Sequence, residues 1–277
     1  MTRVEEIKKI LQRKPSKKNW NQLWDKFLTC NPTESAEAME AVKKKFAKKW
    51  GPDECTIEDL DWSLPFHPML AVVHTITMSV KGMSAIPKEL GAFLAKTAVV
   101  NLELKNCEHL TDIKELGQIK KLRSLKIIWC RRLADLSGLE TLKSLGMIEL
   151  SGSYSLSDFS PLYGLKKLYT VDLSETKGFS DFQSLGKVKS IRKLILANCT
   201  GLSSIAGLDG LQSLTEADFT WCDGIRGSRE FANLPKLKRI LFCHNNWFEV
   251  APESNILSSR KQVEAYQQKV QAFYANK

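Results

Sequence analysis

The sequence lacks a long apolar run. Nothing in its 277 residues approaches the ~18 consecutive apolar positions that a membrane-spanning helix needs. Residues 1–18 alternate apolar and charged positions, so the unbroken apolar core of a signal peptide is missing as well. With 43% hydrophobic and 26% charged residues, the composition is that of an ordinary globular chain. These observations predict a cytoplasmic protein with no membrane span.

The sequence also lacks the motifs of catalysis and metal binding. It has four histidines, and none belongs to a recognisable motif. No CxxC pair, glycine-rich phosphate loop or nucleophile elbow occurs. Cys243 and His244 are neighbours, but neighbours on a strand point to opposite faces and do not form a thiol–imidazole pair. We therefore expect no enzyme activity, no metal site and no cofactor.

What the sequence does have is a 23-residue repeat that returns seven times between about 80 and 250. One position of each repeat, called the ladder position below, holds a small, mildly polar residue. The seven residues at the ladder position are Cys107, Cys130, Ser153, Thr176, Cys199, Cys222 and Asn245. Apolar residues lie five and three positions before it and three positions after it, as Leu125, Ile127 and Leu133 do around Cys130. Self-similarity with this length and spacing is the signature of a solenoid.

Each repeat predicts one short strand and one short outer turn. The alternation of Leu125 and Ile127 with polar residues indicates a strand with one buried face. The ladder residue follows, where its side chain can bond backbone groups that the turn leaves unpaired. An aspartate then suits the cap of a short helical or 3₁₀ turn. In the last units Ser204, Gly227 and Ser228 replace the expected aspartate or apolar residues, which predicts a less regular outer wall there.

The segment Leu122–Cys130 reads L-x-x-L-x-L-x-x-C, and this pattern resembles the leucine-rich repeat superfamily over roughly residues 75–250. The short repeats and their ladder cysteines are similar to the bacterial and cysteine-containing types. The resemblance implies an α/β solenoid, an arc with parallel strands on the concave face and short helical or 3₁₀ turns on the convex face. It also implies a binding scaffold and not a particular activity.

Helical caps are expected at both ends of the solenoid, because terminal repeats expose core that must be covered. Apolar stripes predict helices over 3–13, from about 19, and from Asn31-Pro32 to residue 50, followed by a connector over 53–68. Ser258 or Ser259 suits the cap of a last helix. We expect a helical N-terminal cap domain over 1–74, a solenoid of about eight units over 75–250, and a capping helix within 251–277.

Four of the seven cysteines occupy the ladder position. Spacing at whole repeats favours reduced thiols in the core. Disulfides remain an alternative at this point.

Strand residues that alternate with the buried ones are expected on the concave face, where they predict a protein-binding site. Acidic residues beside exposed aromatics suit an interface with a basic protein partner. The candidate residues are Lys126, Ile128, Trp129, Glu149, Asp172, Glu175, Glu216, Asp218, Trp221, Arg239 and His244. In the alternative interpretation the polar residues only solvate the sheet, and both tryptophans bend over its edge to pack on neighbouring turns.

Positive charge suggests a second kind of site. The formal net charge is +10, and residues 1–50 hold 13 lysines and arginines against 6 acids. Clustered basic residues can bind polyanions such as nucleic acid or an anionic membrane surface. The candidates are Lys43, Lys44, Lys45, Lys120, Lys143, Lys166 and Lys189, of which the last four are 23 residues apart. Solvated helix faces and exposed turns give the same pattern, so this remains the alternative.

Taken together, the sequence predicts a monomeric, non-catalytic protein-interaction module with a protein partner on its concave face. An adaptor, an inhibitor of the immunity-protein kind and a secreted-effector-like protein all fit this description. Binding of nucleic acid or an anionic surface through the N-terminal helices and the lysine column is the alternative function.

Overall fold

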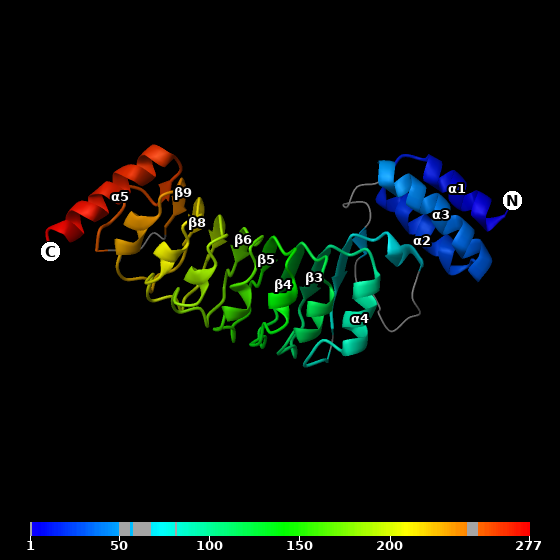
Figure 1. Ribbon diagram of the computed structural model, residues 1–277, viewed down its shortest axis with the longest axis horizontal. Helices are drawn as coiled ribbons and strands as arrows, with labels where there is room; N and C mark the ends of the chain where they lie inside the picture. Colours follow the sequence, from blue (N-terminus) through cyan, green and yellow to red (C-terminus); the bar gives the residue numbers. More distant parts are fainter. Residues whose placement is uncertain (1, 50–55, 58–67, 81, 243–248) are drawn as a thin grey trace.

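The computed structural model describes residues 2–49, 56–57, 68–80, 82–242 and 249–277. Over these residues the chain forms an arc with one terminus at each end (Figure 1). Strands line the concave side of the arc, short helical turns form its convex side, and helices stand at both ends. This is the α/β solenoid that the repeat predicts.

The described residues contain one ten-stranded sheet whose strand order follows the chain from β1 to β10. From β3 onward, neighbouring parallel strands pair with an offset of 23 residues, as Leu102 does with Leu125 and Ile148 with Val171. Only β10 is antiparallel to its neighbour. The strands are β1 Thr56–Ile57, β2 Thr75–Met78, β3 Asn101–Lys105, β4 Ser124–Ile128, β5 Met147–Glu149, β6 Thr170–Asp172, β7 Lys193–Ile195, β8 Glu216–Asp218, β9 Arg239–Leu241 and β10 Ile256–Leu257.

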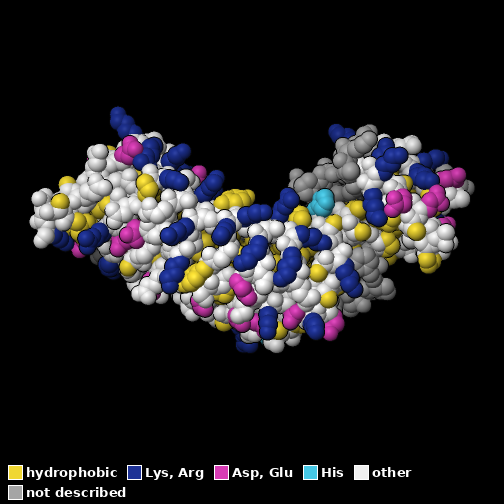
Figure 2. Space-filling view, viewed as in Figure 1, with side chains coloured by type: hydrophobic (Ala, Val, Ile, Leu, Met, Phe, Trp, Pro, Cys, Tyr) yellow, Lys and Arg dark blue, Asp and Glu magenta, His cyan; other side chains and the backbone are white. Residues whose placement is uncertain are grey.

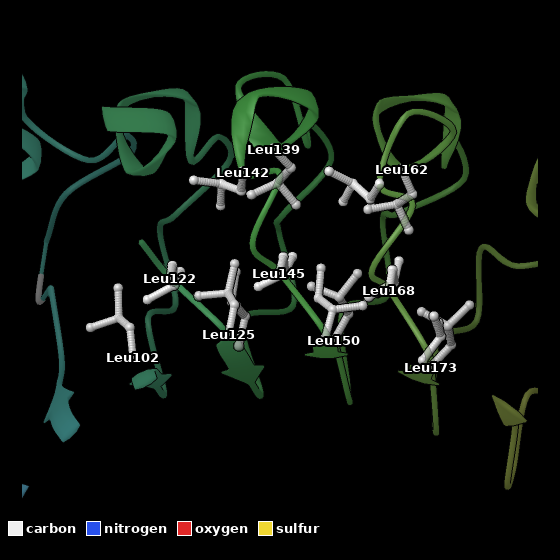
Figure 3. Packing of buried hydrophobic residues seen from close by; sticks show 14 of the residues in the cluster. Leu102, Leu122, Leu125, Leu139, Leu142, Leu145, Leu150, Leu162, Leu168 and Leu173 are labelled. Atoms are coloured by element: carbon white, nitrogen blue, oxygen red, sulfur yellow. The ribbon is translucent and has the colours of Figure 1, made fainter. Parts of the chain in front are cut away.

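The core lies between this sheet and the outer turns. The repeating leucines and their equivalents are fully buried there, as Leu125, Leu139 and Leu150 show. In Figure 3 the leucines of the strands face those of the outer turns, and each repeat stacks on the next. Each short strand alternates inward and outward residues, so the polar residues between the buried ones remain on the concave surface.

The aspartates bond the backbone just ahead of the outer turns, but they do not cap the 3₁₀ turns as predicted. Gly138 and Phe159 hold the N-cap positions of the turns Leu139–Thr141 and Ser160–Leu162, and neither turn has a side-chain cap bond. The carboxylate of Asp135 accepts the Ser137 N–H at 2.7 Å, and Asp158 accepts the Ser160 N–H at 2.8 Å. The expectation of an irregular wall is wrong at Ser204, because its hydroxyl accepts the Ala206 N–H at 3.1 Å in the same way. The 3₁₀ turns are η1 Pro68–Ala71, η2 Lys114–Gln118, η3 Leu139–Thr141, η4 Ser160–Leu162, η5 Leu185–Lys187, η6 Leu208–Gly210 and η7 Arg229–Asn233.

Three ladder residues, Thr176, Cys199 and Cys222, donate to carbonyls of the preceding turn of the solenoid, whereas the buried Ser153 hydroxyl has no partner among the described residues. Thr176 donates to the carbonyl of Leu150 at 3.2 Å, and the thiol of Cys199 donates to Leu173 at 3.0 Å. Each acceptor lies 26 residues earlier, in the preceding turn. Cys107, Cys130, Cys199 and Cys222 are buried free thiols. The neighbouring Cys107 thiol and burial raise the pKa of Cys130, so this group remains a protonated donor. The ladder position is therefore structural.

Helices α1 Arg3–Gln12, α2 Lys17–Leu28 and α3 Pro32–Lys49 form the N-terminal end. Asn31 caps α3 as predicted: its side chain accepts the Glu34 N–H at 2.9 Å, and its own N–H donates back to Glu34 at 3.1 Å. The buried residues of these helices, apart from Val4, belong to the same hydrophobic cluster as Met69 and the solenoid core. The boundary at residue 74 stays a prediction.

Two elements near this end differ from expectation. Thr56–Ile57 falls within the expected connector, yet it pairs with β2 and extends the sheet. The first repeat carries an α-helix, α4 Lys88–Lys96, on its outer side instead of a 3₁₀ turn. Its buried Leu90 and Leu94 pack against η2. A full helix at the first repeat covers more core than a 3₁₀ turn does.

The C-terminal end is closed by helix α5 Arg260–Ala275 and by β10. Ser259 caps α5 and forms a capping box with Gln262, which confirms the predicted helix start. Val263, Tyr266 and Val270 are buried, as the apolar stripe predicts. Within the described part of the chain, no helix is long and apolar enough to cross a membrane.

Candidate functional site

The residue just before each ladder position forms a row along one edge of the concave face, called the rim row below. Its described members adopt left-handed backbone conformations. They are Asn106, Trp129, Gly152, Glu175, Asn198 and Trp221, with φ between 53° and 71°. The backbone N–H groups of the first five members bond the next repeat, as Trp129 does to the Ser151 carbonyl at 2.9 Å and Glu175 to Ala197 at 2.8 Å. The row is therefore fixed by backbone hydrogen bonds.

Tryptophan is an unusual occupant of such a position. A left-handed conformation costs a residue with a Cβ atom about 1 kcal/mol or more, and glycine and asparagine occupy it most readily. Gly152, Asn106 and Asn198 fit this preference, whereas Trp129 and Trp221 do not. The glycine and the two asparagines at equivalent positions of the repeat are the signal in the sequence that indicates a left-handed conformation at this position.

The two tryptophans are placed differently on the rim row. Trp129 leans onto the next repeat, where a Cβ atom added to Gly152 would lie 2.7 Å from its ring. The Arg131 guanidinium lies over the same ring at 6.0 Å from its centre. Trp129 nonetheless remains 38% exposed, and Trp221 is 59% exposed. The alternative in which the tryptophans bend over the sheet edge to pack on neighbouring turns therefore holds in part for Trp129. Trp221 is the more exposed of the two.

Next to the rim row, carboxylates follow one another across neighbouring strands. Glu149 pairs in register with Asp172, and Asp218 lies two strands further along the same row. Lys126 neutralises Glu149 at 3.1 Å. Asp172 instead accepts only neutral donors in the described residues, the Ser174 hydroxyl at 2.6 Å and the Ser174 N–H at 2.9 Å.

The environment of Asp172 disfavours its charge. Burial raises the pKa of this carboxyl group above its ordinary value, and the Ser174 hydrogen bonds oppose that shift. The negative charges of Glu149 and Asp218 raise the pKa further. Asp172 is therefore a partly buried carboxylate that a cation from a partner would stabilise.

Asp172→Asn is expected to stabilise the protein at pH 7. The pKa of Asp172 in the folded protein is raised above the unfolded value of about 3.9. The contribution of this group to the free energy of unfolding is therefore fully present below a pH of about 3.9, and it is lost as pH rises through the folded-state pKa. Asparagine has no charge and keeps the acceptor for Ser174. Urea unfolding should therefore show a higher free energy of unfolding for the variant than for wild type at pH 7, and this difference should shrink as pH falls toward 4. A variant less stable than wild type at pH 7 would contradict this account.

The hollows beside the two tryptophans of the rim row differ in charge. One, of about 420 Å³, is lined by Ser174, Glu175, Ala197, Asn198, Trp221 and Asp223, and its charged residues are acids. The other, of about 620 Å³, is lined by Asn106, Glu108, His109, Trp129, Arg131 and Arg132. Trp129 and Trp221 are four repeats apart, roughly 19 Å at the usual strand spacing. The predicted tryptophans and acids thus share one edge of the concave face.

The remaining predicted concave residues are less directly involved. Glu216 faces Lys193 across neighbouring strands at 3.8 Å, so its charge is partly compensated. Ile128 is half-buried, and Arg239 is exposed at the start of β9. His244 lies outside the described residues. Glu108, His109, Arg131, Arg132 and Asp223 line the hollows and were missed, because they come after the ladder position, where no strand alternation assigns them a face.

The candidate polyanion-binding residues fall into two separate groups. On α3, Lys43 pairs with Glu40 at 3.3 Å, and Lys44 is exposed. Lys45 is half-buried beside them. The column of Lys120, Lys143, Lys166 and Lys189 is exposed along one flank of the solenoid, far along the chain from α3. In Figure 1, α3 stands in the N-terminal helical end, whereas the column belongs to the repeats of the solenoid, so the two groups do not form one continuous row.

The arc of parallel strands, the 3₁₀ turns η2 to η7 on its convex side and a ladder of buried thiols and hydroxyls define the leucine-rich-repeat fold. Among solved structures, internalin C2 of Listeria monocytogenes str. 4b F2365 is similar at 23% identity and a TM-score of 0.53, over 68% of this chain and 80% of that chain. A chain of the mouse RP105/MD-1 complex is similar at 18% identity and a TM-score of 0.51, over 65% of this chain and 36% of that one. No protein-family description matches the sequence. No curated protein matches it either.

Proposed function

We propose that this chain is a protein-binding module whose site is the rim row and the adjoining concave strands between Trp129 and Trp221. The observation that carries the proposal is the pair of exposed tryptophans held in left-handed conformations. Large exposed aromatics in an unfavourable backbone region do not improve folding, whereas they are the residues that most often dominate protein interfaces.

The charges along this edge suit a partner with basic groups. Asp172 and Asp218 accept hydrogen bonds from neighbouring hydroxyl and N–H groups, which hold their carboxylates in place, and Glu175 lies next to them in the hollow beside Trp221. A lysine or arginine from the partner would lower the pKa of Asp172 and relieve the repulsion between these carboxylates. The tryptophans would then supply most of the affinity, and the acids would speed association and select for positive charge.

The module is proposed to act as a monomer. Its last parallel strand, β9, is covered by the antiparallel β10, and α5 lies beyond it. The edges of the sheet are the two-residue strands β1 and β10, which offer a second copy little backbone with which to pair. A protein partner is therefore expected to meet side chains of the concave face and not a sheet edge.

Trp129→Ala combined with Trp221→Ala is expected to abolish capture of the partner. The wild-type protein and the variant would be immobilised side by side, and bound proteins compared by quantitative mass spectrometry. A partner so identified should lose about 2 kcal/mol per tryptophan in direct titration, roughly 30-fold each. Tyr163→Ala is the matched control, since Tyr163 is 36% exposed on the convex side after η4. Equal capture by the double variant, with an unchanged circular dichroism spectrum, would refute the proposed site.

A further inference from the structure

One flank of the solenoid is far more basic than the rest of the molecule. In each repeat the chain crosses this flank between the outer turn and the strand, over residues 119–123, 142–146, 165–169, 188–192, 211–215 and 234–238. These six crossings hold ten lysines and arginines and no aspartate or glutamate. The residues, called the basic flank below, are Lys120, Lys121, Arg123, Lys143, Lys166, Lys167, Lys189, Arg192, Lys236 and Lys238.

The opposite flank, where the chain leaves the strands, is balanced. Its crossings over 106–109, 129–132, 152–155, 175–178, 198–201 and 221–224 hold three lysines and arginines and three acids. Both flanks contain exposed residues, so solvation alone does not explain why acids are missing from only one. Figure 2 shows a flank of the solenoid covered by Lys and Arg side chains, with Asp and Glu mainly along its lower edge.

Backbone hydrogen bonds arrange part of the basic flank in a regular row. The Arg123 carbonyl accepts the Gly146 N–H at 2.8 Å, Gly146 accepts Tyr169 at 2.8 Å, and Tyr169 accepts Arg192 at 2.9 Å. The row continues through Thr215 to Lys238 with bonds of 2.8 Å. Neighbouring members are therefore about 4.8 Å apart, and the row from Arg123 to Lys238 is about 24 Å long.

An aromatic ring lies in the middle of this row. Tyr169 is 52% exposed, and its ring covers Gly146, where an added Cβ atom would lie 2.7 Å from the ring. Gly146 thus leaves room for the tyrosine to lie flat along the flank. Arg123 and Arg192, both exposed, stand on either side of it in the row.

Most of the cations are available to a ligand. Nine of the ten are exposed. The tenth, Lys121, donates to the carbonyls of Ala95 and Thr97 and is structural. Lys143 reaches the Gly164 carbonyl at 3.4 Å, a long bond that a phosphate could replace.

We infer that the basic flank is a binding site for single-stranded nucleic acid, separate from the concave protein-binding site. Cations at regular spacing along a groove or edge track a phosphate backbone, and an exposed aromatic ring among them stacks on a base. A narrow row about 24 Å long suits a linear polymer better than a membrane surface, which would favour a broad patch with inserted apolar side chains.

The test uses the full chain and a fluorescein-labelled 12-nucleotide oligo-dT, with fluorescence anisotropy as the readout. Binding is expected in about 50 mM salt, with a steep loss of affinity as salt rises. Replacing Arg123, Lys189 and Arg192 by glutamine should reduce the slope of log K against log salt by about 2, since each neutralised contact to a single strand contributes about 0.7. Tyr169→Ala should weaken binding about tenfold and leave that slope unchanged.

Two matched variants separate this site from other basic regions. Replacing Arg131, Arg132 and Lys177 on the opposite flank by glutamine removes the same number of charges and should leave affinity unchanged. Replacing Lys43, Lys44 and Lys45 should also have no effect. The inference is overturned if wild type does not bind, or if either matched variant loses as much affinity as the flank variant. It is also overturned if wild type binds vesicles of phosphatidylcholine and phosphatidylserine but not the oligonucleotide. Loss of partner capture in the tryptophan variant has no bearing on these outcomes.

Discussion

Phe182→Ala is expected to lower the free energy of unfolding by about 3–5 kcal/mol, the usual range for removing a buried phenylalanine. Phe182 is fully buried in the middle of the solenoid. Its ring meets Phe179 edge-to-face at 5.1 Å and Phe219 at 6.5 Å. Alanine would remove both contacts and leave a cavity that the rigid stack of repeats cannot easily close.

The position of Phe182 in a chain of rings increases the effect. Successive aromatic side chains contact one another from the middle of the solenoid to its C-terminal helix. They are Phe159, Phe179, Phe182, Phe219, Phe231, Phe242 and Tyr266. In a solenoid each repeat is stabilised by its neighbours, so a cavity between two repeats weakens the coupling of the parts on either side.

Urea unfolding followed by circular dichroism measures the loss. Phe182→Leu is the matched control, because Leu136 occupies the equivalent position two repeats earlier and is buried there. This replacement keeps an apolar side chain of the size that the fold already accepts, and its cost should remain below about 1.5 kcal/mol. If alanine and leucine destabilised the protein equally, the cavity argument would be wrong.

The repeating core could be predicted from the sequence because each turn obeys the same local rule. Alternation placed Leu125 and Ile127 inward, and the 23-residue period transferred this assignment to the other repeats. The aspartates recur with the same period, and Asp135 and Asp158 each accept the backbone N–H two residues later, although they do not cap the 3₁₀ turns that follow. Departures from the period were not predictable in this way. Helix α4 and strand β1 lie where the repeat is irregular or absent, so no neighbouring unit indicated their structure.

The candidate site was only partly predictable for a different reason. Trp129 and Trp221 were recognised as following the strands, but the left-handed conformation depends on how the chain turns toward the next repeat. Arg131, Arg132 and Asp223 lie beyond that turn, where strand alternation no longer applies. Their places along the hollows became visible only when the path of the backbone was known.

The distribution of charge shows the same limitation. Counting charges along the chain assigned most of the positive charge to residues 1–50. Within the solenoid, acids of the other surfaces offset the lysines and arginines of the basic flank, so a count by segment conceals them. Arg123 and Arg192 are exposed in the row beside the lysine column, yet they stand at a different position of the repeat. A charge pattern in a solenoid must therefore be read by position within the repeat as well as along the chain.

This separation of charge bears on how the two proposed sites can operate together. The concave edge carries Asp172, Asp218 and Glu175, whereas the basic flank carries no acid. A basic protein and a nucleic acid would meet different surfaces of the same turns. Because a nucleic acid is also attracted to basic proteins, one chain could hold both ligands close together without either occupying the other's site.

Tyr266→Ala is expected to destabilise the C-terminal repeats by about 3–5 kcal/mol, as removal of other large buried rings does. Tyr266 lies on α5, and its ring contacts Phe242 at 5.5 Å and Phe231 at 6.0 Å. Its hydroxyl donates to the Val250 carbonyl at 3.0 Å. Burial raises the pKa of Tyr266, so the hydroxyl stays a protonated donor at neutral pH. The helix also satisfies carbonyls of η7, since Gln267 donates to Phe231 at 2.8 Å.

The loss should begin locally. Each repeat contacts mainly its neighbours, so weakening the cap frees the last repeats before the first ones. Hydrogen exchange is expected to show lost protection in β8 and β9 while β3 and β4 keep theirs. Tyr266→Phe keeps the ring and removes only the hydroxyl, and it should cost about 1 kcal/mol with the same pattern. A uniform loss of protection from β3 to β9 in the alanine variant would show instead that the arc unfolds as a single cooperative unit.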